Sequence, residues 1–284
     1  MINLKNRRII VNNDFDGCLC ARLLSTFYNC KIVGFSNSKN RLWFVDNEKF
    51  TGDELFVDMF TPKYDSIDQH IPPYAFDRNW SANKDRNIYV FENYTRKYPF
   101  STYIFLLSIA ARDGYNLMRI LPKTLSIGDG FFKESDILFR ADDILTNYIL
   151  YIKNTRDWVD YTLKWTNNNP HIRRIFDFMG QQDKDKAAAW KKSIDEYFSK
   201  NYDFHAEEIP DITTNEAKKF MSRFGINFSK ITDTVYLKHI RTTIKDKNEF
   251  DTLYNQAGDT LFSFAFVYAP WNIEKKNFSY SLIT

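Results

Sequence analysis

Short apolar runs separated by helical patterns organise the first third of the chain. The runs RIIV at 8–11 and KIVGF at 31–35 read as strands, because each is short, rich in β-branched residues and bounded by polar ones. Between them, residues 18–28 have the spacing of a helix. A third strand is predicted at 54–60, between the turn signals TGD and TPK. Strands that alternate with helices predict βαβ units and a largely parallel sheet.

Helical and then strand-like patterns fill the rest of the chain. The apolar segment 99–115 predicts a buried helix with Ser101 or Thr102 as its N-cap, and the pattern stays helical from about 142 to 198. The later runs predict a mostly antiparallel sheet. We therefore predict an α/β protein, with a parallel-sheet, Rossmann-like N-terminal domain flanked by helices and a smaller α+β C-terminal domain. The antiparallel runs lie at 233–240, 259–271 and 277–284.

Polar segments mark the predicted domain boundaries. The segments at 180–186 and 201–216 are rich in charged and amide residues, as junctions are. We expect an N-terminal domain over 1–182, a helical linker over 183–228 and a C-terminal domain over 229–284.

Composition limits the kinds of partner. Among 284 residues, 39 are basic and 36 acidic, a net charge of +3 that does not support a long nucleic-acid track. The sequence contains no uninterrupted run of 18 apolar residues, so no membrane span is predicted. The N-terminus lacks the apolar segment of a secretory signal. The three cysteines, Cys18, Cys20 and Cys30, are then expected to be reduced thiols of a cytoplasmic protein. The sequence leaves homo-oligomerisation open.

Two aspartates stand where the first strand meets the first helix. Asp14 and Asp16 can turn toward one point there, and two converging carboxylates repel unless a cation or proton lies between them. Mg²⁺ and Mn²⁺ accept such oxygen ligands. Helix capping is the alternative, and it explains one aspartate better than two with Asn12 and Asn13 beside them.

Further candidate ligands follow the later strands. Asp58 is a single acid in the apolar run LFVDMF, and a buried carboxylate needs a cation or strong donors. Asp68, Gln69 and His70 end another short strand-like approach. Because ligands bind at the carboxyl ends of parallel strands, these positions favour a binding site.

These motifs resemble the DHH phosphoesterase superfamily, which includes nanoRNases, single-strand exonucleases and cyclic-dinucleotide phosphodiesterases. The resemblance rests on Asp14-Phe15-Asp16, on Asp58 and on the DQH of residues 68–70. The segment KYPFST at 97–102 looks like the family's next motif.

The likeness extends into the second half of the chain. Asp129 in SIGDG lies where the family's fourth acidic motif is expected, and the run at 261–284 resembles the first strands of the companion domain, DHHA1.

The resemblance implies a metal-dependent phosphate site. Asp14, Asp16, Asp58 and Asp129 would hold one or two Mn²⁺ or Mg²⁺ ions, with Asp58 bridging. His70 would lie beside the phosphate.

Further roles follow by the same resemblance. His70 and Asp68 would be the catalytic residues, Asn12 and Gln69 would be additional metal ligands, and Arg140 would join His70 in binding the substrate. The implied substrate is a nucleotide or short oligonucleotide.

Departures from the family pattern bear on activity. Asn12 or Ile10 stands where the family has histidine, Gln69 replaces the first histidine of Asp-His-His, and the glycine-rich substrate-gripping segment is missing before Thr284. Neutral carbonyl oxygens suit Mg²⁺ or Ca²⁺ better than imidazole-preferring metals. We therefore expect a divalent-metal-dependent phosphodiesterase or phosphohydrolase of weak or altered activity, with a non-catalytic nucleotide-binding or interaction protein as the alternative.

A second enzyme class shares the first motif. DFDGCL also resembles the opening of haloacid-dehalogenase-type phosphatases, in which Asp14 would be the nucleophile and Asp16 the acid/base. Cys18 replaces the threonine of that motif and DQH is left unexplained, so this interpretation ranks lower. An α/β scaffold whose acids only cap helices, as Asp142 or Asp143 would, is the remaining alternative.

Overall fold

The computed structural model describes residues 3–37, 39–120, 152–180, 214–267 and 276–284. These residues form a mixed α/β protein with two compact units. The sheet unit comprises Met1–Asn13, Cys30–Tyr98 and Ser229–Thr284, and the helical unit comprises Asp14–Asn29 and Pro99–Phe228.

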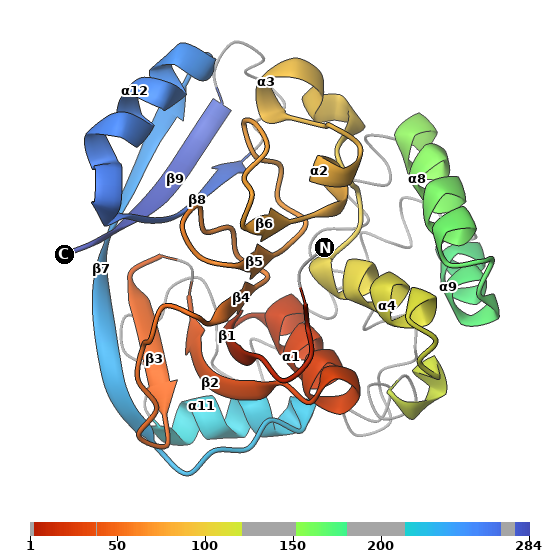
Figure 1. Ribbon diagram of the computed structural model, residues 1–284, viewed down its shortest axis with the longest axis horizontal. Coiled ribbons are helices and arrows are strands. Elements are labelled where there is room, and N and C mark those ends of the chain that lie inside the picture. Colours follow the sequence, from red (N-terminus) through yellow and green to blue (C-terminus); the bar gives the residue numbers. More distant parts are fainter. Residues whose placement is uncertain (1–2, 38, 121–151, 181–213, 268–275) are drawn as a thin grey trace. The chain divides into compact units, whose positions relative to one another are not determined.

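One sheet contains all nine strands that the described residues form, in the order β6-β5-β4-β1-β2-β3-β7-β9-β8 (Figure 1). The neighbours from β6 to β2 are parallel, as predicted for the N-terminal part, and the remaining pairs are antiparallel. The strands are β1 (Arg8–Asn12), β2 (Lys31–Ser36), β3 (Arg41–Val45), β4 (Leu55–Val57), β5 (Ser66–Ile67), β6 (Asn79–Trp80), β7 (Ile231–Ile244), β8 (Leu261–Val267) and β9 (Lys276–Ile283).

The central strand β1 lies between β2 and β4 and is buried on both faces. Ile9, Ile10 and Val11 have no exposed surface, which explains why the run is apolar throughout and does not alternate. The strand predicted at 54–60 is shorter, because regular pairing ends at Val57 and the next residue is in the left-handed region. The strand β3 was not among the predicted elements, although RLWFV has a strand composition.

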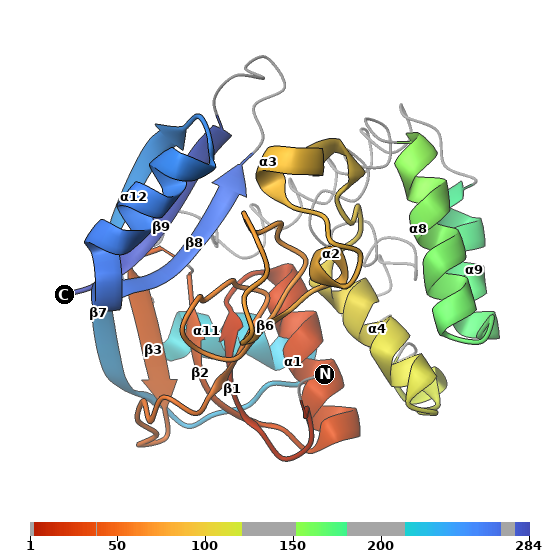
Figure 2. The same cartoon turned by 45° about the horizontal axis from the view of Figure 1, so that its top comes forward.

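The predicted antiparallel strands at the C-terminus are confirmed, and they continue the N-terminal sheet. The strand β7 has 14 residues, about 46 Å of extended chain. Its first part pairs with β3 from Arg41 to Val45, and its second part pairs with β9 (Figure 2). One long strand therefore joins the two halves of the sheet.

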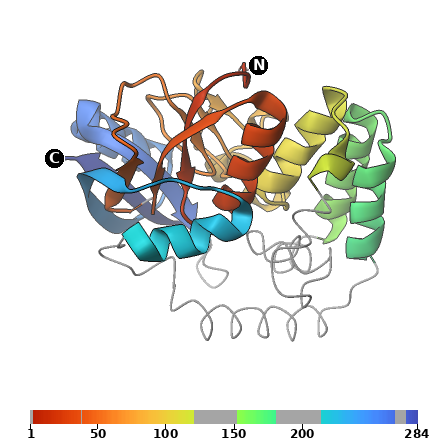
Figure 3. The ribbon, with the colours of Figure 1, turned by 90° about the horizontal axis from the view of Figure 1, so that it is seen from below.

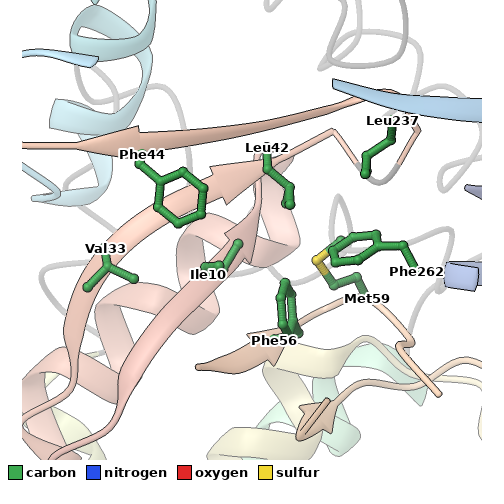
Figure 4. Packing of buried hydrophobic residues seen from close by; sticks show 8 residues of the cluster. All are labelled: Ile10, Val33, Leu42, Phe44, Phe56, Met59, Leu237 and Phe262. Atoms are coloured by element: carbon green, nitrogen blue, oxygen red, sulfur yellow. The ribbon is translucent and has the colours of Figure 1, made fainter. Parts of the chain in front are cut away.

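Two apolar clusters stabilise the sheet unit. The first joins β1, β2, β3 and β4 to β7 and β8 through buried aliphatic and aromatic side chains (Figure 4). The second lies under α12 (Lys247–Ala257), where the fully buried ring of Phe250 contacts Phe264, Phe266 and Phe278. The first cluster consists of Ile10, Val33, Leu42, Phe44, Phe56, Met59, Leu237 and Phe262.

Short helices accompany the strands of the sheet unit. Ser81 caps the first of them, with its Oγ accepting from Lys84 N at 3.2 Å. Besides α12, they are α2 (Ala82–Asp85), α3 (Val90–Asn93), η1 (Tyr94–Arg96) and η5 (Gly258–Thr260).

The helical unit contains the predicted buried helix. This helix, α4 (Thr102–Arg112), has every residue but Arg112 buried, and Ser101 Oγ caps it by accepting from Ile104 N at 3.2 Å. It packs beside α1 (Phe15–Tyr28) and contacts α9 (Figure 3). No described helix has the length and apolar character needed to cross a bilayer. The other helices are η2 (Leu117–Arg119), α8 (Ile152–Trp165), α9 (Pro170–Gly180), α11 (Thr214–Met221) and η4 (Ser222–Phe224).

Candidate functional site

Polar side chains stand at the carboxyl ends of all five parallel strands of the sheet unit. Because these strands run in one direction, their carboxyl ends meet at one edge of the sheet, which is where α/β proteins bind ligands. Most of these side chains are buried, although polar groups are costly to bury. They are Ser36 and Asn37 at β2, Asn12 and Asn13 at β1, Asp58 at β4, Asp68 at β5 and Ser81 at β6.

Asp58 directly follows β4 and is only 3% exposed. Its φ of 60° is in the left-handed region, which aspartate and asparagine adopt more readily than most residues other than glycine. Its N–H donates to Ile67 O at 2.9 Å, and this bond fixes the turn against β5. Asn12 Nδ2 lies 3.5 Å from Asp58 Oδ2, a long contact for a hydrogen bond. The predicted ligands Asn12 and Asp58 are therefore neighbours.

Asp68 is fully buried after β5, and both of its carboxylate oxygens accept hydrogen bonds. Oδ1 accepts from His70 N at 2.7 Å, and Oδ2 accepts from Asn79 Nδ2, also at 2.7 Å. Short bonds of this kind compensate the cost of burying a carboxylate. The carboxylate of Asp68 thus shapes the turn that carries His70.

His70 presents its ring beside Asp68. Nδ1 lies 3.3 Å from Asp68 Oδ1, an ion-pair distance when the ring is protonated, and the side chain is 32% exposed. A carboxylate at Nδ1 places Nε2 on the opposite side of the ring. His70 is therefore the more accessible member of the pair.

The segment from Asp68 to His70 is also held through its backbone. Asn83 Nδ2 donates to Gln69 O at 2.8 Å, and Asn83 Oδ1 accepts from Tyr98 N at 2.7 Å. The Gln69 side chain is buried. Asn83 thereby links this segment to the chain near Tyr98.

Asp14 and Asp16 lie in the helical unit, where each has a capping partner. Asp14 Oδ1 accepts from Gly17 N at 2.9 Å and caps α1. The two oxygens of Asp16 accept from Thr102 N at 2.9 Å and Tyr103 N at 3.0 Å, the first amides of α4. Capping therefore gives a structural reason for both aspartates, not for one alone.

The structure brings five of the predicted site residues together at the edge of the sheet unit. Asp14 and Asp16 belong to the helical unit, and Asp129 and Arg140 lie outside the described residues. Within the described ranges, no three His, Cys, Asp or Glu side chains form a metal-ligand group. The four-aspartate metal site thus stays a prediction. The five residues are Asn12, Asp58, Asp68, Gln69 and His70.

Two asparagines at this edge were not predicted. The side chains of Asn79 and Asn83 donate hydrogen bonds to the Asp68–His70 segment. They were not predicted because β6, at this place in the chain, has only two residues and gives no periodic pattern. The one available signal was the helix-start sequence SANK after Trp80, which indicates a turn at this place.

Comparisons with protein-family models, with curated proteins and with solved structures gave no match for this chain.

Proposed function

We propose that the protein is a divalent-metal-dependent phosphoesterase that acts on nucleotides or short oligonucleotides. The observation that supports this most is Asp58, a buried carboxylate in the left-handed region at the carboxyl end of a central parallel strand. It has Asn12 on one neighbouring strand and the Asp68–His70 segment on the other. This is the position at which α/β proteins bind phosphate-containing ligands.

The donor chemistry of this edge fits a hard cation. Asp58 offers a carboxylate, and Asn12 and Gln69 carry amide oxygens, the ligand types that Mg²⁺ and Ca²⁺ prefer. A bound cation would polarise the phosphate and lower the pKa of a water molecule.

His70 would contact the phosphate in this proposal. Asp68 Oδ1 lies 3.3 Å from Nδ1, so Nε2 is the ring nitrogen that would donate to or accept from a phosphate oxygen. Asp68 itself is enclosed by its own hydrogen bonds and would act on the ring, not on the substrate.

The test is hydrolysis of bis-p-nitrophenyl phosphate and of a dinucleotide, with Mg²⁺, Mn²⁺ and Ca²⁺ supplied in turn. We expect Asp58→Asn to lower kcat/KM at least about 100-fold, since loss of a ligand should exceed the 10–100-fold cost of losing its support. Asp77→Asn, at an exposed carboxylate of the same unit, should stay within about twofold. Equal activity in Asp58→Asn and the wild type would refute the metal mechanism.

A nucleotide-binding protein without turnover is the second candidate. It is favoured by Asp16 and Asp68, each of which uses both carboxylate oxygens for hydrogen bonds within the fold. Calorimetry with dinucleotides and each cation separates the two functions. Binding that Asp58→Asn weakens, with no hydrolysis by the wild type, would support the binding protein.

A further inference from the structure

Asn79 holds the carboxylate of Asp68 from the neighbouring strand. It is 2% exposed, and its Nδ2 donates to Asp68 Oδ2 at 2.7 Å and to Ser66 Oγ at 3.1 Å. An ionised carboxylate only accepts hydrogen bonds, so the amide must present its NH₂ group to it. The orientation of the Asn79 amide is therefore fixed by Asp68.

The other end of the same amide is not used in this way. Asn79 Oδ1 is buried and has no hydrogen-bond partner among the residues that the structure describes. A buried asparagine with a purely structural role usually pairs both ends of its amide. Among the described residues, the hydrogen bonds of the Asn79 side chain are therefore those of its NH₂ group, to Asp68 and Ser66.

The carboxylate in turn orients a histidine. With Oδ2 bonded to Asn79, Asp68 directs Oδ1 toward His70, whose Nδ1 is 3.3 Å away and whose N–H donates to the same oxygen. A carboxylate oxygen 3.3 Å from Nδ1 favours the proton on that nitrogen, which leaves the lone pair of the neutral ring on Nε2. Asn79, Asp68 and His70 thus follow one another from the buried strand β6 to the partly exposed imidazole ring.

We propose that Asn79 is a positioning residue that acts through Asp68 to fix the orientation and tautomer of His70. The inference rests on the proposed function in one respect, the use of His70 at a phosphate. The tautomer of the His70 ring can be measured whether or not the protein hydrolyses a phosphate ester.

The test is ¹⁵N NMR of histidine-labelled protein at a pH where the imidazoles are neutral, with the His70 signals assigned by their loss in His70→Gln. We expect mainly the Nδ1–H form in the wild type. Asn79→Leu should shift the ring toward the Nε2–H form, because Asp68 can then rotate away. In an Asp68→Asn background, Asn79→Leu should cause no further shift.

Two results would overturn the inference. One is an unchanged tautomer in Asn79→Leu, and the other is a shift of equal size in the Asp68→Asn background, which would mean that Asn79 acts by another route. If the leucine variant does not fold, Asn79→Ser takes its place, because the serine side chain is too short to reach Asp68 and the same tautomer shift is expected. Thr61→Val is the control, because it removes a hydrogen bond of another buried side chain in the sheet unit and should lower stability with the tautomer unchanged.

Kinetics separate this inference from the proposed function. If the wild type hydrolyses phosphodiesters, Asn79→Leu should lower kcat about tenfold with KM within twofold, as expected for loss of support to a catalytic group. If the wild type has no activity with any cation, the proposed function fails, and the tautomer alone decides the role of Asn79.

Discussion

At the scale of single residues, Asp16 is the side chain whose role the structure defines best. Its carboxylate joins α1 to the first two amides of α4, both in the helical unit, and it is 3% exposed. The sequence motif alone suggested a metal ligand at this position. The structure adds a capping role that requires no metal.

We predict that Asp16→Ala lowers the free energy of unfolding by about 1–3 kcal/mol, because it removes the acceptor of two buried amides. Asp14→Ala, which removes one bond to Gly17 N, should cost about 1 kcal/mol. Urea unfolding in the presence of EDTA measures both, so that no bound metal contributes. A loss for Asp16→Ala that appears only when metal is present would assign the residue to a metal site instead.

At the scale of elements, the pairing of β2 with β3 depends on one glycine. Gly34 pairs with Phe44, and a Cβ built on Gly34 would lie 2.4 Å from Trp43 O. No real side chain tolerates that distance, so any larger residue would push the two strands apart.

We expect Gly34→Ala to lower the free energy of unfolding by about 1–3 kcal/mol, the usual cost of overpacking. Gly114→Ala is the control, because its φ of 84° strains an alanine although nothing lies within 4 Å of the added Cβ. That strain costs about 1–2 kcal/mol without moving a strand. Amide hydrogen exchange in β2 and β3 distinguishes the two, since only Gly34→Ala should weaken protection there.

The length and burial of the strands explain why some of them were predictable from the sequence. Strands β1 and β2 contain continuous apolar runs because their buried residues face both sides of the sheet, and such runs are visible in the sequence. Strand β5 lies in the strand-like approach predicted before Asp68, whereas the two residues of β6 are too few for any period. The carboxyl end of β6 nevertheless carries Ser81, so this part of the candidate site rests on an element that no pattern could predict.

At the scale of the whole molecule, ion pairs tie distant parts of the sheet unit together. Asp65 Oδ2 accepts from Arg7 at 2.9 Å, and Oδ1 accepts from Arg78 at 3.0 Å. Partial burial alone would raise the pKa of Asp65, but the hydrogen bonds and charges of the two arginines outweigh it and lower this pKa. The folded protein therefore favours the ionised carboxylate more than the unfolded chain does.

The resulting pH dependence has a definite sign. The carboxylate of Asp65 binds a proton at a higher pH in the unfolded chain than in the folded protein. Its contribution to the free energy of unfolding is therefore complete above the unfolded pKa of about 3.9, and it is lost as the pH falls through the lower folded pKa. We expect Asp65→Asn to be less stable than the wild type at neutral pH, with the difference shrinking in acid. Urea midpoints at a series of pH values check this, and a constant difference would contradict it.

The sequence by itself determined the strands with continuous apolar runs, the buried helix with its Ser101 cap, and the set of acids and amides near strand ends. It could do so because burial and capping are local requirements that each segment must meet on its own. Only the tertiary structure decided that β7 joins the two parts of the sheet, that Asp16 caps a helix 86 residues further along the chain, and that Asn79 holds Asp68. These contacts join residues far apart in sequence, and hydrogen-bond partners at such distances are chosen by the packing of strands and helices, which leaves no pattern in the segments themselves.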